Sequence, residues 1–272
     1  MSKVILVTGA SSGIGKATAQ QLIKEGHTVY VAARRVEKME DLKAQGARPL
    51  KMDITLEEDI ESVASTILNA HGSLDVLVNN AGYAIYGAME DTSIDDARRQ
   101  FEVNLFGLAR LTQMFLPTMR EKKSGTIINM SSMGGKIYTP LGAWYHATKH
   151  ALEGWSDCLR LELNPFGIDV VIIEPGAIVT EFGDVMIGPM MERSGNTAYG
   201  KMAHSIGNAT KEAYEKGDGS PATVISDLVS KVVNASRPKT RYAAGKFAKP
   251  MMFIRKWVSD RMFDRIIMSQ VK

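Results

Sequence analysis

Length, composition and charge define a globular protein of ordinary make-up. The chain has 272 residues, a length at which a single α/β domain is common. Its 44% hydrophobic and 23% charged residues exclude disordered and collagen-like classes. The 33 basic and 30 acidic residues nearly balance, so we predict no nucleic-acid partner. With Cys158 as the single cysteine, internal disulfides and CxxC zinc sites are excluded.

The first two thirds of the chain alternate short β-branched runs with stretches of helical period. Strands are expected at residues 4–8, 28–33, 49–52, 74–79, 126–131 and 168–174. Helices are expected at residues 14–25, 36–45, 56–71, 94–121 and 144–164, with Ser93 capping the fourth through Asp96. Because the strands are mostly apolar rather than alternating, helices should cover both faces of a parallel sheet. This predicts one Rossmann-type, doubly wound α/β domain of three layers.

The last third of the chain is less regular. Residues 183–219 are rich in Gly, Met, Ser and Asn, which indicates a long functional or mobile loop. Ser220 and Pro221 then carry the chemistry of a helix start, before a helix near 221–235 and a strand at 240–245. We divide the domain into a core (1–180), a substrate loop (181–220) and C-terminal helices that close the pocket (221–272).

A glycine loop follows the first strand and opens the first helix. It reads Thr8-Gly9-Ala10-Ser11-Ser12-Gly13-Ile14-Gly15, and its backbone N–H groups suit a pyrophosphate at a helix N-terminus. A P-loop would need glycine at position 10, and the GxGxxG spacing is also absent. A merely structural tight turn is the alternative.

Polar residues close the next three strands, at the edge where doubly wound sheets bind ligands. Arg34 and Arg35 stand at the end of the second strand, where guanidinium groups favour the phosphate of NADP(H) over NAD(H). The alternative is two solvated arginines. Asp53-Ile54 closes the third strand, and Asn79-Asn80-Ala81-Gly82 closes the fourth.

A candidate catalytic set lies further along the chain. Tyr145 and Lys149 share one helix face at i, i+4, where a cation would lower the tyrosine pKa and make the phenol useful near neutral pH. Such pairs are also common without any function. Ser132 follows the fifth strand, where its hydroxyl can bond a substrate oxygen beside Tyr145. Asn104 interrupts an apolar helix stripe, as a relay residue or as a hydrogen-bonded core asparagine.

Together these motifs resemble the short-chain dehydrogenase/reductases. The resemblance covers residues 3 to about 180 in order and spacing, including Tyr145-x3-Lys149 and Pro175-Gly176. It implies that Ser132 and Tyr145 hold a carbonyl oxygen and that Tyr145 donates the proton. Lys149 would lower the tyrosine pKa and hold the nicotinamide ribose, while Asn104 binds a water that links Lys149 to solvent.

The resemblance also implies a set of cofactor contacts. Asp53 would lie at the adenine, Asn80 on the ribose side, and Pro175-Gly176 through Thr180 around the nicotinamide. Counting the glycine loop and the arginines, the expected cofactor-binding residues are Gly9, Ser11, Ser12, Gly13, Ile14, Gly15, Arg34, Arg35, Asp53, Ile54, Asn80, Ala81, Gly82, Tyr145, Lys149, Pro175, Gly176, Ile178 and Thr180.

The C-terminal third is similar to a narrower branch of that family. Its length and Arg241-Tyr242-x-x-Gly245 resemble 17β-hydroxysteroid, retinol and acyl-dihydroxyacetone-phosphate reductases, which implies a bulky apolar substrate. Met186, Met190 and Met191 either line an adaptable apolar pocket or pack the loop onto the body. The family further implies a homodimer or homotetramer.

Other features lead to expectations of absence or remain open. The five histidines show no metal-ligand spacing, so no metal site is predicted. No apolar run is long enough to span a bilayer and no signal peptide is recognisable, so a cytoplasmic location is expected. The basic and aromatic tail, with Arg255, Lys256 and Trp257, either packs on the body or touches a membrane surface.

The sequence therefore predicts an NADP(H)-dependent oxidoreductase that reduces a ketone or aldehyde, or oxidises the matching alcohol. One alternative is a nucleotide-binding regulatory protein of the same fold without turnover. Another is an epimerase or dehydratase with the same Tyr and Lys, although only about 90 residues follow Thr180.

Overall fold

A parallel sheet forms the centre of the molecule. The computed structural model describes residues 2–271, apart from the side chains of residues 182–185 and 214. Within that range seven strands run parallel in the order β3-β2-β1-β4-β5-β6-β9. They are β1 (Val4–Thr8), β2 (Thr28–Ala33), β3 (Arg48–Lys51), β4 (Val76–Asn79), β5 (Gly125–Met130), β6 (Ile168–Pro175) and β9 (Arg241–Ala244). Successive strands are added toward one edge of the sheet from β1 to β3 and toward the other edge from β4 onward. This change of direction between β1 and β4 opens a crevice at their carboxyl ends.

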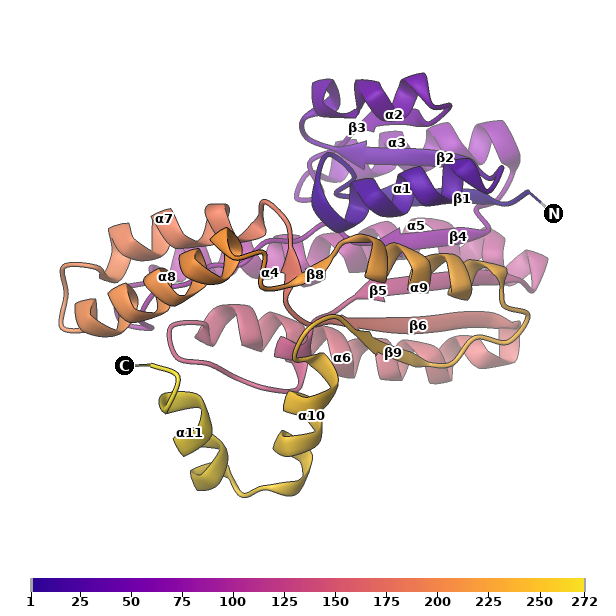
Figure 1. Cartoon of the computed structure of the whole chain (residues 1–272). Coiled ribbons are helices and arrows are strands. Elements are labelled where there is room, and N and C mark those ends of the chain that lie inside the picture. Colours follow the sequence, from indigo (N-terminus) through magenta and orange to yellow (C-terminus); the bar gives the residue numbers. More distant parts are fainter. Residues whose placement is uncertain (1, 272) are drawn as a thin grey trace.

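Helices cover both faces of this sheet. They include α1 (Gly13–Lys24), α2 (Glu40–Ala44), α3 (Glu57–His71), α4 (Ile94–Phe101), α5 (Gly107–Lys122), α6 (Ala143–Leu163) and α9 (Thr223–Asn234). Figure 1 shows α1 and α9 in front of the strands, with α3, α5 and α6 behind them. The strand side chains alternate accordingly: Val7 joins Leu22 and Val229 in one core cluster, and Leu6 joins Phe115 in the other. The predicted Rossmann-type α/β fold is confirmed.

One predicted helix contains a widened turn. Residues 94–121 were expected to be one helix, and α4 and α5 are instead joined by a π-helical turn at Glu102–Phe106. Its start agrees with the sequence, since the Ser93 hydroxyl accepts a hydrogen bond from the Asp96 N–H at 3.0 Å. The π turn carries Asn104, which is 1% exposed.

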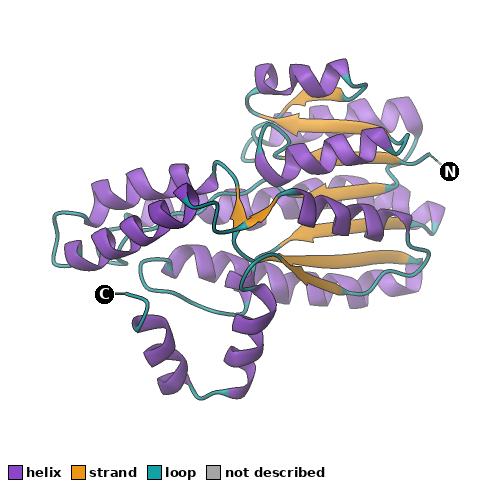
Figure 2. Ribbon diagram, in the orientation of Figure 1, coloured by secondary structure: helices purple, strands orange, loops and turns teal. Residues whose placement is uncertain are grey.

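The segment after β6 differs most from expectation. The sequence predicts an irregular segment at residues 183–219. Most of it instead forms two helices, α7 (Phe182–Ser194) and α8 (Gly200–Glu215). This helical pair projects beyond the sheet (Figure 2). The buried Met190 and Ala203 pack this pair together. The predicted helix start at Ser220-Pro221 is also wrong. These two residues form β8 (Ser220–Pro221), which pairs with β7 (Ile178–Val179), and the helix begins at Thr223.

The chain ends in an arm of two helices, α10 (Ala248–Trp257) and α11 (Asp260–Met268), which stands beside the sheet at the bottom of Figure 1. Its inner side packs on the segment after Ser132 through Phe263, Ile267 and Ile137. None of the helices in the described part of the chain is long and apolar enough to cross a membrane.

Candidate active site

The carboxyl ends of the strands open into a cavity of about 1330 Å³. This volume exceeds the roughly 300–1,000 Å³ of an ordinary small-molecule site, so it has room for a dinucleotide and a second molecule. Nineteen of the predicted site residues line it: Gly9, Ser11, Ser12, Gly13, Ile14, Arg34, Arg35, Asp53, Ile54, Asn80, Ala81, Gly82, Ser132, Tyr145, Lys149, Pro175, Gly176, Ile178 and Thr180. Gly15 and Asn104 do not line it.

The glycine loop presents the start of α1 to this cavity. Gly9 has a φ of +65°, and a Cβ there would lie 2.8 Å from the Cα of Ala81. A Cβ at Gly15 would lie 2.4 Å from both the Asn80 Nδ2 and the Gly9 carbonyl oxygen, so this glycine allows the loop to pack closely against Asn80. The first turn of α1 has no acidic residue, and Ser12 makes no side-chain cap bond. The backbone N–H groups at the start of this helix therefore suit a pyrophosphate.

Hydrogen bonds join the first and fourth strands next to this loop. The Thr8 hydroxyl accepts from the N–H of Asn80 at 3.0 Å and of Ala81 at 2.9 Å. The Asn80 Nδ2 donates to the Thr8 carbonyl at 2.9 Å and to the Gly9 carbonyl at 3.3 Å. The predicted Asn79-Asn80-Ala81-Gly82 segment thus shapes the cavity wall through bonds within the protein.

Charged groups gather at the ends of β2 and β3. Burial opposes ionisation of Asp53, but hydrogen bonds from the Thr55 N–H and hydroxyl, with the Arg34 charge, hold its pKa below the ordinary value. Asp53 is therefore a carboxylate that can only accept hydrogen bonds. Arg34 and Arg35 offer two guanidinium groups on the same wall, the chemistry that a phosphate needs.

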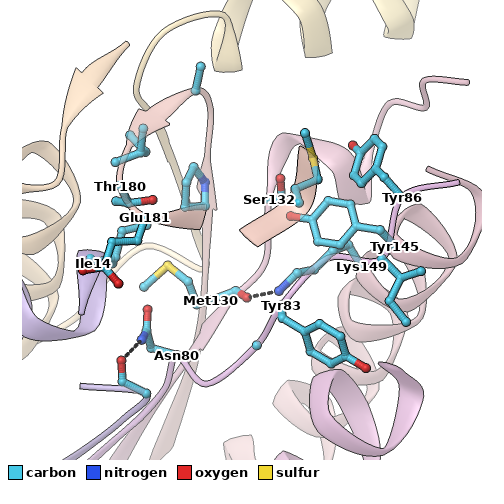
Figure 3. Close-up of a pocket in the computed structure, with 18 of the residues that line it drawn as sticks. Ile14, Asn80, Tyr83, Tyr86, Met130, Ser132, Tyr145, Lys149, Thr180 and Glu181 are labelled. Atoms are coloured by element: carbon cyan, nitrogen blue, oxygen red, sulfur yellow. Dashed lines mark hydrogen bonds between the residues drawn. The ribbon is translucent and has the colours of Figure 1, made fainter. Parts of the chain in front are cut away.

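Tyr145 and Lys149 lie in the first two turns of α6 and face the cavity (Figure 3). The Lys149 ammonium donates to the Met130 carbonyl at 2.8 Å and lies 6.0 Å from the centre of the Tyr145 ring. Tyr145 is hydrogen-bonded to Ser132. The Ser132 hydroxyl also accepts from the Gly134 N–H at 3.0 Å, which holds it at the head of a short helix, Met133–Gly135. The sheet end and α6 thus bring the predicted trio together.

The electrostatics of the pair differ from the sequence expectation. Burial raises the pKa of Tyr145 well above its ordinary value, against the effect of the Ser132 hydrogen bond, and the nearby Tyr86 raises it further. The net direction of the Tyr145 pKa is thus upward, opposite to the direction expected from the Lys149 charge alone. Burial also lowers the pKa of Lys149 to about 8, while the charge of Glu153 opposes that shift. At neutral pH Tyr145 is a protonated phenol, able to donate, beside a mostly charged lysine.

Asn104 is buried, and its side chain makes three hydrogen bonds within the protein. Its Nδ2 donates to the Tyr83 carbonyl at 2.9 Å and to the Thr148 hydroxyl at 3.1 Å, and its Oδ1 accepts from the Tyr83 N–H at 3.1 Å. Thr148 in turn donates to the Tyr145 carbonyl at 2.8 Å. These bonds match the core-asparagine alternative, and one lone pair of Oδ1 is left for a relay role.

Sequence reasoning missed His146 and Tyr86. His146 Nε2 accepts from the Thr139 N–H at 3.1 Å, so its Nδ1 carries the proton and donates to the Gly134 carbonyl at 2.9 Å. Burial lowers the pKa of this histidine, which stays neutral and pins the segment after Ser132 to α6. The Tyr86 ring lies 6.0 Å from the Tyr145 ring. In the sequence, only the position of His146 directly after Tyr145 indicates that this histidine lies near the site.

A buried acidic pair lies one layer below the site. Glu153 follows Lys149 by one turn of α6, and Glu174 directly precedes Pro175; they are 3% and 5% exposed. Glu153 pairs with Arg241 at 3.1 Å and with Lys136 at 2.9 Å. The same arginine lies 3.7 Å from Glu174. Burial and the Glu153 charge raise the pKa of Glu174 to about 7.

The Glu174 carboxyl should therefore make stability depend on pH. Because its folded pKa is raised from 4.5 to about 7, its contribution is fully present below 4.5 and is lost as the pH rises through 7. Glu174→Gln stays neutral, so we expect wild-type stability near pH 4.5 and a gain of up to about 3 kcal/mol above about pH 8. Urea unfolding at both pH values measures it.

Glu162→Gln is the matched control for this prediction, because Glu162 is an exposed carboxylate of the same helix, α6. It should change stability little at either pH. If Glu174→Gln instead destabilises the protein at high pH, Glu174 is an ionised partner of Arg241 and the assignment of its raised pKa is wrong.

Comparison with known proteins identifies the family. Residues 3–186 match the family described as short chain dehydrogenase. The chain belongs to this family of oxidoreductases, as the Rossmann-type sheet and the Tyr145-x3-Lys149 helix indicate.

Individual proteins resemble this chain in sequence and in structure. A 3-ketodihydrosphingosine reductase of Bacteroides thetaiotaomicron is 40% identical over 182 residues, which span 67% of this chain and 66% of that protein. The match thus covers just under two thirds of the reductase. A short-chain dehydrogenase structure from Streptomyces avermitilis superposes with a TM-score of 0.81 at 33% identity, over 99% of this chain and 95% of that one. A closed serine dehydrogenase complexed with NADP+ gives a TM-score of 0.78 at 26% identity, over 89% and 94% of the two chains.

Proposed function

We propose that this protein is an NADP(H)-dependent oxidoreductase that reduces a ketone or aldehyde to an alcohol, reversibly, on a bulky apolar substrate. The observation that carries the proposal is the buried Tyr145 hydroxyl, bonded to Ser132 and facing a cavity beside Lys149. A regulatory protein that only binds a nucleotide needs the glycine loop but no buried proton donor. No contact described at this site favours an epimerase or a dehydratase over a reductase.

The residues at the cavity fit a nicotinamide dinucleotide. The start of α1, with Gly9, Ser11, Ser12, Gly13 and Ile14, would hold the pyrophosphate, because its N–H groups and helix dipole favour an anion. Asp53 and Ile54 would contact the adenine, and Pro175, Gly176, Ile178 and Thr180 the nicotinamide end. Such a cofactor supplies or takes up the hydride.

The catalytic residues of this chain then handle the oxygen of the substrate and its proton. Tyr145 and Ser132 bond the carbonyl oxygen through their hydroxyls, which orients the carbonyl and polarises it. Tyr145 donates its proton to that oxygen as the alcohol forms, acting as the general acid. Lys149 places a positive charge near the phenolate that remains, and this stabilises it. Asn104 holds the Tyr83 segment against α6 and keeps Lys149 and Tyr145 in register.

Arg34 and Arg35 support a preference for NADP(H). Their side chains line the cavity at the end of β2, where an acidic residue would repel a 2′-phosphate. The similar serine dehydrogenase structure contains NADP+. Of the two arginines, we assign the phosphate first to Arg34, whose charge also acts on Asp53.

Apolar lining supports a bulky substrate, as in the 17β-hydroxysteroid dehydrogenase-like branch. Met186 of α7 and Ile206 of α8 line the cavity, while Met190 and Met191 pack the two helices together. The three methionines therefore divide between the two alternatives drawn from the sequence. The 40%-identical relative is named for a 3-keto sphingoid base, a long-chain ketone.

A panel of carbonyl compounds tests the substrate class. NADPH oxidation by the purified protein is measured with small ketones, steroids, retinal and long-chain acyl ketones at equal concentration. We expect kcat/KM to rise with apolar size, because burial of each further methylene contributes about 0.8 kcal/mol. Equal rates across the panel, or a preference for small polar ketones, would contradict the apolar pocket.

A further inference from the structure

The terminal arm concentrates exposed apolar side chains. Among the described residues, twelve large hydrophobic side chains are exposed, and five of them lie between residues 247 and 268. Phe253 and Trp257 are the most exposed of the five, at 66% and 69%, and their ring centres are 6.3 Å apart. Single exposed apolar residues are normal, but a cluster of this kind marks an interaction surface.

Two lysines flank these aromatic rings on the same helix face. Lys249, Phe253, Lys256 and Trp257 follow one another at i, i+4, i+7 and i+8 of α10, so they form one stripe, the α10 stripe. All four are exposed. The Lys256 ammonium lies 5.6 Å from the centre of the Trp257 ring. An aromatic stripe with basic flanks combines an apolar contact with attraction to negative charge.

The arm carries an excess of positive charge on its outer side. Helix α10 contains three basic residues and no acidic one. The two acidic residues of α11 have partners within the protein, because Asp260 pairs with Arg255 at 2.8 Å and Asp264 accepts from Tyr138 at 2.9 Å. In residues 2–271 no described carboxylate pairs with Lys249, Lys256, Arg261 or Arg265. The outer face is thus basic as well as aromatic.

The inner side of the arm is fixed to the body, so the stripe is held outward. Phe263 is fully buried and packs with Ile137 and Ile267. The Arg255 guanidinium lies over the rings of Tyr138 and Phe263, at 5.3 Å and 5.5 Å. Beyond α11, Gln270 and Val271 line the cavity, as does Ile267. The arm therefore lines the candidate active site on one side and carries exposed side chains on the other.

We propose that the α10 stripe docks this protein on an anionic lipid surface. A second protein is the less suitable occupant, because lysine is depleted at the centre of protein interfaces, whereas aromatic residues beside lysines are typical of helices in the membrane interface. Docking goes beyond the proposed reaction and does not depend on it. Docking would place the part of the arm that lines the cavity next to the lipid surface.

Vesicle binding by the full-length protein tests the proposal. The probes are vesicles of phosphatidylcholine alone and of phosphatidylcholine mixed with phosphatidylglycerol, assayed by flotation. We expect binding to the mixed vesicles, weakened by salt, and little binding to phosphatidylcholine. Lys249→Gln with Lys256→Gln should weaken binding roughly 30-fold, since each lysine near such a surface contributes about 1 kcal/mol. Phe253→Ser with Trp257→Ser should weaken it at least about tenfold.

Controls separate docking from damage to the fold. Leu161→Ser removes an apolar side chain that is 71% exposed on α6, and it should bind vesicles like the wild type. All variants should keep wild-type NADPH binding, because none of the changed residues lines the cavity. Absence of binding to the mixed vesicles, or binding that both double variants retain, overturns the proposal. So does a wild-type oligomer that the aromatic double variant dissociates, because the stripe would then cover a second copy.

Discussion

Tyr145→Phe should lower kcat by at least about 10²-fold, the effect expected when a general acid is removed. The change deletes one hydroxyl and keeps the ring, which packs 6.0 Å from Tyr86. Burial holds the pKa of this hydroxyl high, so in the wild type it is protonated and ready to donate. The affinity for NADPH should stay within a few-fold, because the residues assigned to the pyrophosphate and the 2′-phosphate are untouched.

Tyr86→Phe is the matched control for this prediction. It removes the same group from a neighbouring, half-buried tyrosine whose pKa is also raised by desolvation. We expect less than about a tenfold loss of kcat there, since Tyr86 has no assigned proton transfer. Equal losses in the two variants would mean that the site needs both hydroxyls for packing and that Tyr145 has no special role.

Arg34→Ala combined with Ala33→Asp should reverse the cofactor preference. The change removes charge-assisted bonds to a 2′-phosphate, each contributing about 1.5–3 kcal/mol, and adds a carboxylate that repels it. The ratio of kcat/KM for NADPH to that for NADH should therefore fall by at least about 10²-fold. Steady-state kinetics with both cofactors measure this ratio.

Single variants locate the phosphate more closely. Ala33 is 7% exposed, so Arg34→Ala alone serves as the version that adds no buried charge. It should account for most of the loss with NADPH. If the double variant still strongly prefers NADPH, the phosphate is bound elsewhere, and Arg35→Ala and Ser11→Ala then identify the contact, because both residues line the cavity.

The sheet was predictable because its strands are continuous apolar runs between helices of clear period. The bounds of β1 and β2 match the sequence prediction residue for residue. The α7 and α8 pair was not predictable in this way. Its many glycines give this segment weak helix propensity, and the packing of Met190 against Ala203, which are distant in sequence, supports the helices.

Two smaller errors have similar causes. Ser220 and Pro221 carry local helix-start chemistry, but pairing with Ile178–Val179 holds them in a strand. The π turn at Glu102–Phe106 has no signal in the hydrophobic period of this segment, although Asn104 within it is an unusual polar residue on an apolar stripe.

The composition of the candidate site was largely predictable, and its energetics were not. Spacing alone placed Tyr145 and Lys149 on one helix face, and strand ends placed the arginines and Asp53 at one edge. The extent of burial depends on the whole fold, and it reverses the expected direction of the Tyr145 pKa. The neutral, doubly hydrogen-bonded state of His146 likewise depends on Gly134 and Thr139, which no spacing rule connects to it.

NADPH oxidation by the wild type and by Tyr145→Phe, on the same carbonyl panel, is the decisive test of the proposed reaction. We expect oxidation by the wild type with one class of bulky apolar carbonyl, formation of the matching alcohol, and loss of both in Tyr145→Phe while NADPH still binds. Tight NADPH binding by the wild type without turnover on any member, or turnover that Tyr145→Phe retains, would contradict it.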